Sequence, residues 1–280
     1  MGLNSTSFAW FPQVDYFSKK PEYSVLVFDN RGVGNSGAPM GPYTTSAMAD
    51  DVVTLLDYVG WTAERDLHVV GISLGGMIAL DSRAHRFSCA RGDSSTAHHS
   101  FRLSIGKLVV RRFSYLPKAE CGVFYRLLVI SDPEAKIPMI LGMLFPQHWL
   151  NAKAEDDPQG RTNLELQAEE YRRRIEVTRP QKPLGALSQM AAAISHNVSP
   201  ERLRNISESI PKVLIITGDQ DNLVPPSSSR YIKEHMPEAE LVEWEDVGHG
   251  IQVQCKNRFN ALLEQVVKEG RDRLAAKSGP

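Results

Sequence analysis

The sequence predicts an α/β fold with a mostly parallel sheet. Short apolar runs of strand length alternate with helical patterns in both the first and the last third of the chain. These runs are nearly continuous, as expected for parallel strands that are buried on both faces. Residues 66–80 combine the two patterns, because an apolar run enters Gly71-Ile72-Ser73-Leu74-Gly75 and a helical pattern follows at once. With 280 residues, of which 42% are hydrophobic, the chain can bury one sizeable core and carry an inserted subdomain.

The first 60 residues predict a helix, a strand and a second helix. Apolar residues recur every three positions over 7–19, which predicts a helix there. The run Tyr-Ser-Val-Leu-Val-Phe within 22–29 predicts a central strand. An apolar stripe over 44–58 predicts the next helix. Strand, loop, helix and strand therefore lead into the turn at Ser73.

The loop after residues 22–29 raises an alternative function. Residues 31–37 match the pattern Gly-x-Gly-x-x-Gly of dinucleotide-binding folds. That site needs a helix that starts within the glycines, so that its N-terminus faces the pyrophosphate. Pro39 and Pro42 keep the chain in a loop instead, and the helix starts only near Thr44. The context therefore rejects a dinucleotide site.

The remaining chain divides into irregular, helical and alternating parts. The predicted elements are an irregular segment over 82–106, a short strand over 107–113, a helical segment over 116–206, strands over 213–217 and 241–244, a helix over 231–236, a C-terminal helix that carries the apolar residues from Phe259 to Val266, and a frayed end over 267–280.

Three residues that can support nucleophilic catalysis lie where predicted strands end. Ser73 lies at the strand-to-helix turn, an aspartate lies within 218–221, and His249 follows the strand over 241–244. Because the carboxyl ends of parallel strands share one edge of a sheet, these side chains are expected to converge. A serine hydroxyl is a weak nucleophile, so a histidine must take its proton and an aspartate must orient the imidazole. Taken singly, the serine could be a helix cap and the histidine a loop residue, but the chain order Ser, Asp, His favours a catalytic triad.

These motifs resemble those of the α/β-hydrolase superfamily over nearly the whole chain. Residues 29–36 look like the turn after the family's fourth strand, residues 71–75 like its nucleophile elbow, and residues 247–250 like its histidine loop. The resemblance implies that Asp221 is the acid of the triad. Asp219 is then expected to form the turn.

The resemblance also implies a domain division and an oxyanion hole. A helical cap over 114–206 would be inserted into a core formed by 1–113 and 207–280. The first three residues look like the family's oxyanion loop, with methionine where histidine often stands. The backbone N–H groups of Leu3 and Leu74 are then the expected oxyanion donors.

The family places a third strand ahead of the oxyanion loop, and no such strand precedes it in this sequence. We therefore expect the first strands of the sheet to be missing, as in an N-terminally incomplete chain. The strands at Val25 and Val69 would then lie about 9.5 Å apart, two strand spacings, and could not share hydrogen bonds.

The motifs and the resemblance together predict a serine hydrolase that cleaves a carboxylic ester or lactone through an acyl-enzyme. Ser73 attacks, His249 transfers the proton and Asp221 orients the imidazole. A serine nucleophile argues against the branches of the family that use aspartate, whereas acyltransferases and thioesterases stay open. Neither a metal nor an organic cofactor is implied. A second hypothesis is a catalytically weak or inactive member of the family that binds a ligand or partner through the cap.

Composition argues against several other classes of protein. The formal net charge is −1, and acidic and basic residues are interspersed. No basic surface that could bind nucleic acid is therefore expected. The longest apolar stretches are shorter than the roughly 18 residues of a membrane span. Cys89, Cys121 and Cys255 lie far apart, so neither a disulfide framework nor a zinc site is expected. A reducing, cytoplasmic location is the resulting expectation.

Overall fold

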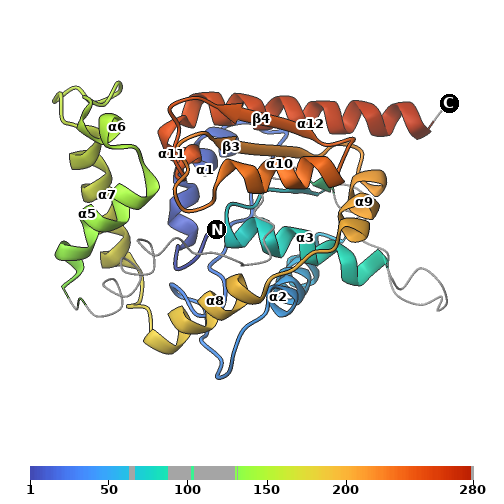
Figure 1. The fold of residues 1–280 in the computed structure, drawn as a ribbon, viewed down its shortest axis with the longest axis horizontal. Coiled ribbons are helices and arrows are strands. Elements are labelled where there is room, and N and C mark those ends of the chain that lie inside the picture. The colour runs from blue at the N-terminus through green and yellow to red at the C-terminus, as the bar shows by residue number, and fades with distance from the viewer. Residues whose placement is uncertain (63–66, 88–101, 104–129, 131, 279–280) are drawn as a thin grey trace.

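Two parallel strand pairs form the framework of the protein (Figure 1). The computed structural model describes residues 1–62, 67–87, 102–103, 130 and 132–278. Within these ranges β1 (His68–Val69) pairs with β2 (Arg102–Leu103), and β3 (Leu214–Gly218) pairs with β4 (Glu240–Trp244). The parallel pairing confirms the predicted α/β class.

Helices precede, separate and follow these strands. They are η1 (Ser7–Trp10), α1 (Phe11–Ser18), α2 (Thr45–Tyr58), α3 (Leu74–Phe87), α5 (Pro133–Leu144), α6 (Gln147–Asn151), α7 (Asn163–Val177), α8 (Pro183–Ser195), α9 (Pro200–Ser209), α10 (Pro226–His235), α11 (Ile251–Gln254) and α12 (Lys256–Ser278). The helix predicted over 44–58 is confirmed as α2, and Thr44 caps it by accepting a hydrogen bond from the Ala47 N–H at 3.1 Å.

Strand β3 lies at the centre of the core, and all five of its residues are buried. Ile215 packs with apolar side chains of α9 and α10. Ile216 packs with side chains of α1, α11 and α12. Because successive residues of a strand point to opposite faces, helices cover β3 on both sides. The turn that carries Asp221 follows β3 directly, and the loop that carries His249 follows β4.

The prediction that residues 267–280 fray is wrong over most of that range, because α12 continues to Ser278. Val266 and Val267 are buried, so the middle of this helix is held by the core. Glu269 forms an ion pair with Lys212 at 2.5 Å. Arg273 donates a hydrogen bond to the Pro211 carbonyl oxygen at 3.2 Å. Glu269 and Arg273 thus bind α12 to the segment that leads into β3.

The predicted strand over 22–29 is not a strand in the structure. A strand needs a hydrogen-bonding neighbour, and none of the described segments pairs with this one. Val25 and Val27 are consequently 41% and 37% exposed. These two valines therefore face solvent, whereas Leu26 and Phe28 are half-buried.

We expect the exposed run at 22–29 to promote association between copies of the chain, because unpaired segments rich in β-branched residues recruit other chains. Val27→Lys should lower the apparent mass measured by sedimentation at high protein concentration. Val59→Lys is the matched control, since Val59 is also 37% exposed but follows a helix. Equal effects of the two substitutions would show that added charge, rather than this segment, governs association.

The prediction of irregular structure over 82–106 is wrong for the part of this range that the structure describes. Helix α3 continues through Phe87, and residues 102–103 form strand β2. Residues 88–101 and 104–106, like the predicted strand over 107–113, lie outside the described residues.

We call α5 to α8, residues 133–195, the helical insert. Figure 1 shows α5, α6 and α7 grouped to one side of the core, whereas α8 lies nearer to α2. The predicted cap over 114–206 begins outside the described residues and ends within α9, whose Leu203 and Ile206 pack into the core beside β3.

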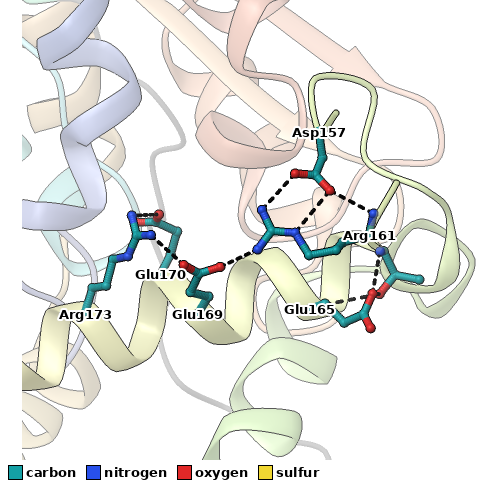
Figure 2. Close-up of polar contacts among 7 residues, drawn as sticks. Asp157, Arg161, Glu165, Glu169, Glu170 and Arg173 are labelled. Atoms are coloured by element: carbon teal, nitrogen blue, oxygen red, sulfur yellow. Dashed lines mark hydrogen bonds and ion pairs between the residues drawn. The ribbon is translucent and has the colours of Figure 1, made fainter. Parts of the chain in front are cut away.

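Helix α7 is fixed by polar contacts at its first turn and along its exposed face (Figure 2). Thr162 and Glu165 form a capping box. Arg161 binds Asp157 at 2.8 Å and Glu169 at 2.6 Å, and so joins the preceding loop to the helix. The pair between Arg161 and Glu169 is partly exposed and contributes little by itself, whereas the capping box satisfies N–H groups at the start of the helix. None of the helices in the described ranges has the length and hydrophobicity to cross a membrane.

Candidate active site

Ser73 occupies a strained turn between β1 and α3. Its φ angle is +56°, a left-handed conformation that non-glycine residues rarely adopt. A Cβ atom on Gly71 would lie 2.3 Å from the Gly75 carbonyl oxygen, so no larger residue fits at position 71. Ile72 and Leu74 are buried on either side, whereas Ser73 is half-buried. The turn therefore presents the serine at the N-terminal end of α3, as the glycine spacing predicts.

Asp221 and His249 form a buried hydrogen-bonded pair. The His249 Nδ1 lies 3.0 Å from Oδ1 and 2.9 Å from Oδ2 of Asp221. Both residues are buried. Oδ1 of Asp221 also accepts hydrogen bonds from the N–H groups of Leu223 and Val224, at 3.0 and 2.9 Å. The carboxylate is therefore fixed in place, and it orients the imidazole with Nδ1 toward itself.

The other two aspartates near His249 have different partners. Asp219 Oδ1 accepts a hydrogen bond from the Val247 N–H at 3.2 Å and so joins the two loops. Asp246 Oδ1 accepts a hydrogen bond from the Gln220 side chain at 2.7 Å. The carboxylate that contacts the imidazole is thus Asp221, the residue that the resemblance indicates.

The first residues of the chain lie against the elbow. A Cβ atom on Gly2 would lie 3.3 Å from Cβ and 3.7 Å from Oγ of Ser73. The segment then turns, because the Ser5 N–H donates to the Gly2 carbonyl at 3.2 Å and Asn4 has a φ of +55°. Leu3, an expected oxyanion donor, is at the start of this turn. Leu74, the other expected donor, is the residue after Ser73, and the Leu3 side chain packs against the apolar cluster that includes Leu74.

The loop that carries His249 packs against the helical insert. The Gly250 N–H donates to the Leu144 carbonyl oxygen at 2.9 Å. A Cβ atom on Gly250 would lie 2.3 Å from the Phe145 ring, and one on Gly248 would lie 2.7 Å from the Leu144 oxygen. Sequence analysis did not identify this contact. In the sequence, the two glycines that flank His249 could have indicated this contact, since glycine is required where another backbone approaches closely.

The sequence profile of the alpha/beta hydrolase family matches residues 2–262. The chain belongs to the alpha/beta hydrolase family. The match therefore covers nearly all of the sequence, including the elbow, the Asp221 turn and the His249 loop.

Similar proteins of this family carry hydrolase names. "Putative carbamate hydrolase RutD" of Caulobacter vibrioides is 28% identical over 271 residues, which cover 94% of this chain and 86% of that protein. The protein of the same name from Stutzerimonas stutzeri is 26% identical, with 98% and 92% covered. These relatives support a hydrolase.

The solved structures share the fold of the family. The enol-lactonase of Burkholderia xenovorans LB400 is 21% identical with a TM-score of 0.70, covering 95% of this chain and 88% of its own. A thermophilic esterase of Thermogutta terrifontis is 21% identical with a TM-score of 0.68, covering 95% and 86%.

Within the described ranges, no group of three acidic, histidine or cysteine side chains is arranged to hold a metal ion.

The described residues contain a second buried aspartate–histidine pair, which sequence analysis missed. Asp81 on α3 lies 3.4 Å from the His196 Nδ1, which is also 2.9 Å from the Thr45 Oγ1. Arg202 on α9 binds the same carboxylate. Burial raises the pKa of the Asp81 carboxyl, but hydrogen bonds from His196 and Thr45 and the charge of Arg202 outweigh it, so its pKa lies below the ordinary value. Among the residues that the structure describes, no serine elbow adjoins this pair, and we interpret it as a structural link between α2, α3 and the chain after α8.

We expect Asp81→Asn to lower the free energy of unfolding at neutral pH. A carboxyl whose pKa is depressed by folding stabilises the protein above its unfolded pKa of about 3.9. That contribution disappears as the pH falls through the lower, folded pKa. Denaturant titrations over a pH series should therefore show the difference between wild type and variant shrinking below about pH 4. A difference that stays constant down to the lowest pH would contradict this assignment.

We expect Gly2→Ala to lower kcat about 10-fold, because the added methyl group would press on Ser73 and displace the first residues from the elbow. Gly37→Ala is the matched control, since a Cβ atom there has open space around it. Steady-state kinetics on both variants provide the measurement. Unchanged turnover by Gly2→Ala would mean that the contact with Ser73 has no influence on the reaction.

Proposed function

We propose that this protein is a serine hydrolase that cleaves a carboxylic ester or lactone through an acyl-enzyme. The observation that carries the proposal is the buried Asp221–His249 pair after β3 and β4, and it is supported by the strained elbow turn of Ser73 after β1. Buried pairs of this kind stabilise an imidazolium during proton transfer. The structural neighbours include an esterase and a lactonase, which is consistent with this chemistry.

In the proposed mechanism, His249 accepts the Ser73 proton at Nε2 while Oγ attacks the carbonyl carbon. Asp221 keeps the proton on Nδ1 and stabilises the imidazolium that forms. The N–H groups of Leu3 and Leu74 donate to the oxygen that becomes negative. His249 then protonates the leaving oxygen, and a water molecule activated by the same imidazole releases the acid.

A carbamate is the second candidate substrate class, because the relatives are named for carbamate hydrolysis. The same residues would then form a carbamoyl-enzyme on Ser73. The two classes differ in the group attached to the attacked carbon and not in the machinery, so a substrate panel is needed to separate them.

Labelling with a fluorophosphonate probe tests the proposal. The purified chain should react at Ser73, as identified by peptide mass spectrometry, and Ser73→Ala should abolish the label. Ser195→Ala, which removes an exposed hydroxyl on α8, is the matched control and should label normally. Parallel assays with p-nitrophenyl esters, a lactone and an aryl carbamate would then rank the substrate classes. Folded protein that does not label would favour a ligand-binding or partner-binding member of the family instead.

A further inference from the structure

Gln189 is a fully buried amide that joins the helical insert to the backbone beside Ser73. It lies on α8 and is 0% exposed. Its Oε1 accepts a hydrogen bond from the Asn4 N–H at 2.9 Å, and its Nε2 donates to the Arg31 carbonyl oxygen at 2.7 Å. A buried amide is costly unless both of its groups are bonded. Here both are bonded, and each partner belongs to a loop near the candidate active site.

Asn4 is a residue whose conformation needs support. Its φ of +55° is disfavoured for a side chain other than glycine, although asparagine tolerates it better than most. Gln181, which precedes α8, donates a hydrogen bond to the Asn4 Oδ1 at 2.9 Å and another to the Gly32 oxygen at 3.1 Å. The backbone N–H and the side chain of Asn4 are therefore both held by residues at or before α8.

The bond from Asn4 to Gln189 constrains the preceding residue. The Asn4 N–H belongs to the peptide plane on one side of Leu3, and the Leu3 N–H belongs to the plane on the other side. Gly2 packs against Ser73 at the far end, and the Leu3 side chain packs into an apolar cluster that includes Leu74. Fixing the Leu3–Asn4 plane therefore limits rotation about Leu3 and sets the direction of the Leu3 N–H.

We propose that Gln189 is a positioning residue for the oxyanion hole. It holds the Leu3 N–H in the direction from which it donates to the developing oxyanion, without touching the substrate itself. This inference rests on the proposed function, because it assigns a role within that reaction. It means that the helical insert contributes to the chemical step through α8, in addition to any part it takes in substrate binding.

Gln189→Leu tests the proposal, because leucine has a similar size and cannot bond to the Asn4 N–H. We expect kcat for an ester to fall about 10- to 100-fold with little change in KM, since losing an oxyanion donor outright costs about 10²- to 10³-fold. Ser188→Ala is the matched control: Ser188 is the buried neighbour on α8 and donates to the Gly41 oxygen at 2.8 Å. This control should lower the melting temperature without lowering kcat.

Affinity for a trifluoromethyl ketone provides a readout that a purely structural role would not change. The ketone carbon bonds to the Ser73 Oγ, the proton passes to His249, and the carbonyl oxygen becomes an oxyanion. Gln189→Leu should weaken this inhibitor by the same factor as it lowers kcat, because both depend on the oxyanion donors. The affinity for the corresponding methyl carboxamide, which stays planar, should be unchanged.

Gln189→Glu extends the test to a variant of nearly the same shape. When protonated, the acid can accept from the Asn4 N–H and donate to the Arg31 oxygen, as the amide does. When ionised, it repels the Arg31 oxygen. The ratio of its kcat to that of the wild type should therefore rise as the pH falls and decline as the pH rises.

The outcomes separate this inference from the proposed function. A wild-type chain that is folded yet inert toward both probe and esters would refute the proposed function. Active wild type with Gln189→Leu indistinguishable from Ser188→Ala would refute the positioning role alone. If Gln189→Leu does not fold, Gln189→Glu decides, and a pH-independent activity ratio for that variant would overturn the inference.

Discussion

Replacing His249 with alanine is expected to lower kcat/KM about 10⁶-fold, the loss seen when the base of a serine triad is removed. His249 contacts the buried Asp221 carboxylate through Nδ1, and in the proposed mechanism its other nitrogen takes the serine proton. Without the imidazole, Ser73 has no base and its hydroxyl is a poor nucleophile. Initial rates at high enzyme concentration, together with the rate of fluorophosphonate labelling, provide the measurement.

His235→Ala is the control for this substitution. His235 lies at the end of α10, and its Nδ1 faces the Tyr231 oxygen at 2.9 Å. Turnover by that variant should match the wild type. If His249→Ala kept more than a hundredth of the activity while remaining folded, the reaction would not pass through this histidine.

Asp221→Asn is expected to lower kcat about 10⁴-fold while leaving the fold intact. The asparagine oxygen can still accept from the Leu223 and Val224 N–H groups, so the turn should persist. Its amide nitrogen would then face the His249 Nδ1 as a donor. The imidazole would have to carry its proton on Nε2, which leaves no lone pair to accept the Ser73 proton. Steady-state kinetics and a thermal melt on the same preparation test both parts of the expectation.

Asp219→Asn distinguishes this effect from a general loss of charge at the turn. The new side chain can still accept from the Val247 N–H, as Asp219 does, so activity should change less than about 3-fold. Comparable losses in the two variants would mean that the turn as a whole, rather than the Asp221–His249 pair, supports the activity.

The elements that carry the candidate triad could be predicted because their signals are local. Glycine spacing around Ser73 follows from the close approach within the elbow, and the apolar run before Asp221 follows from the burial of β3. The shared edge of parallel strands predicts that Ser73, Asp221 and His249 converge, and the contact between Asp221 and His249 agrees with that prediction. Each inference depends on a few neighbouring residues or on a rule that holds for every such sheet.

The predictions that failed depend on partners that the local sequence does not name. The run at 22–29 has the composition of a central strand, but a strand forms only where another segment pairs with it. The charged end of α12 was expected to fray, and its ion pair with Lys212 depends on a segment far away in the chain. The role of Gln189 was also invisible, because a glutamine within a helical pattern normally indicates only an exposed face.

The contact between Phe145 and the glycines around His249 has a consequence for protein engineering. Residues 144–146 and 248–250 touch through backbone atoms and a ring that leaves no room for a Cβ atom. Exchanging the insert for that of a relative would replace one side of this contact and keep the other. Chimeras should therefore fold well only when both segments come from the same parent protein. The two segments thus have to be exchanged together, although they lie about a hundred positions apart in the sequence.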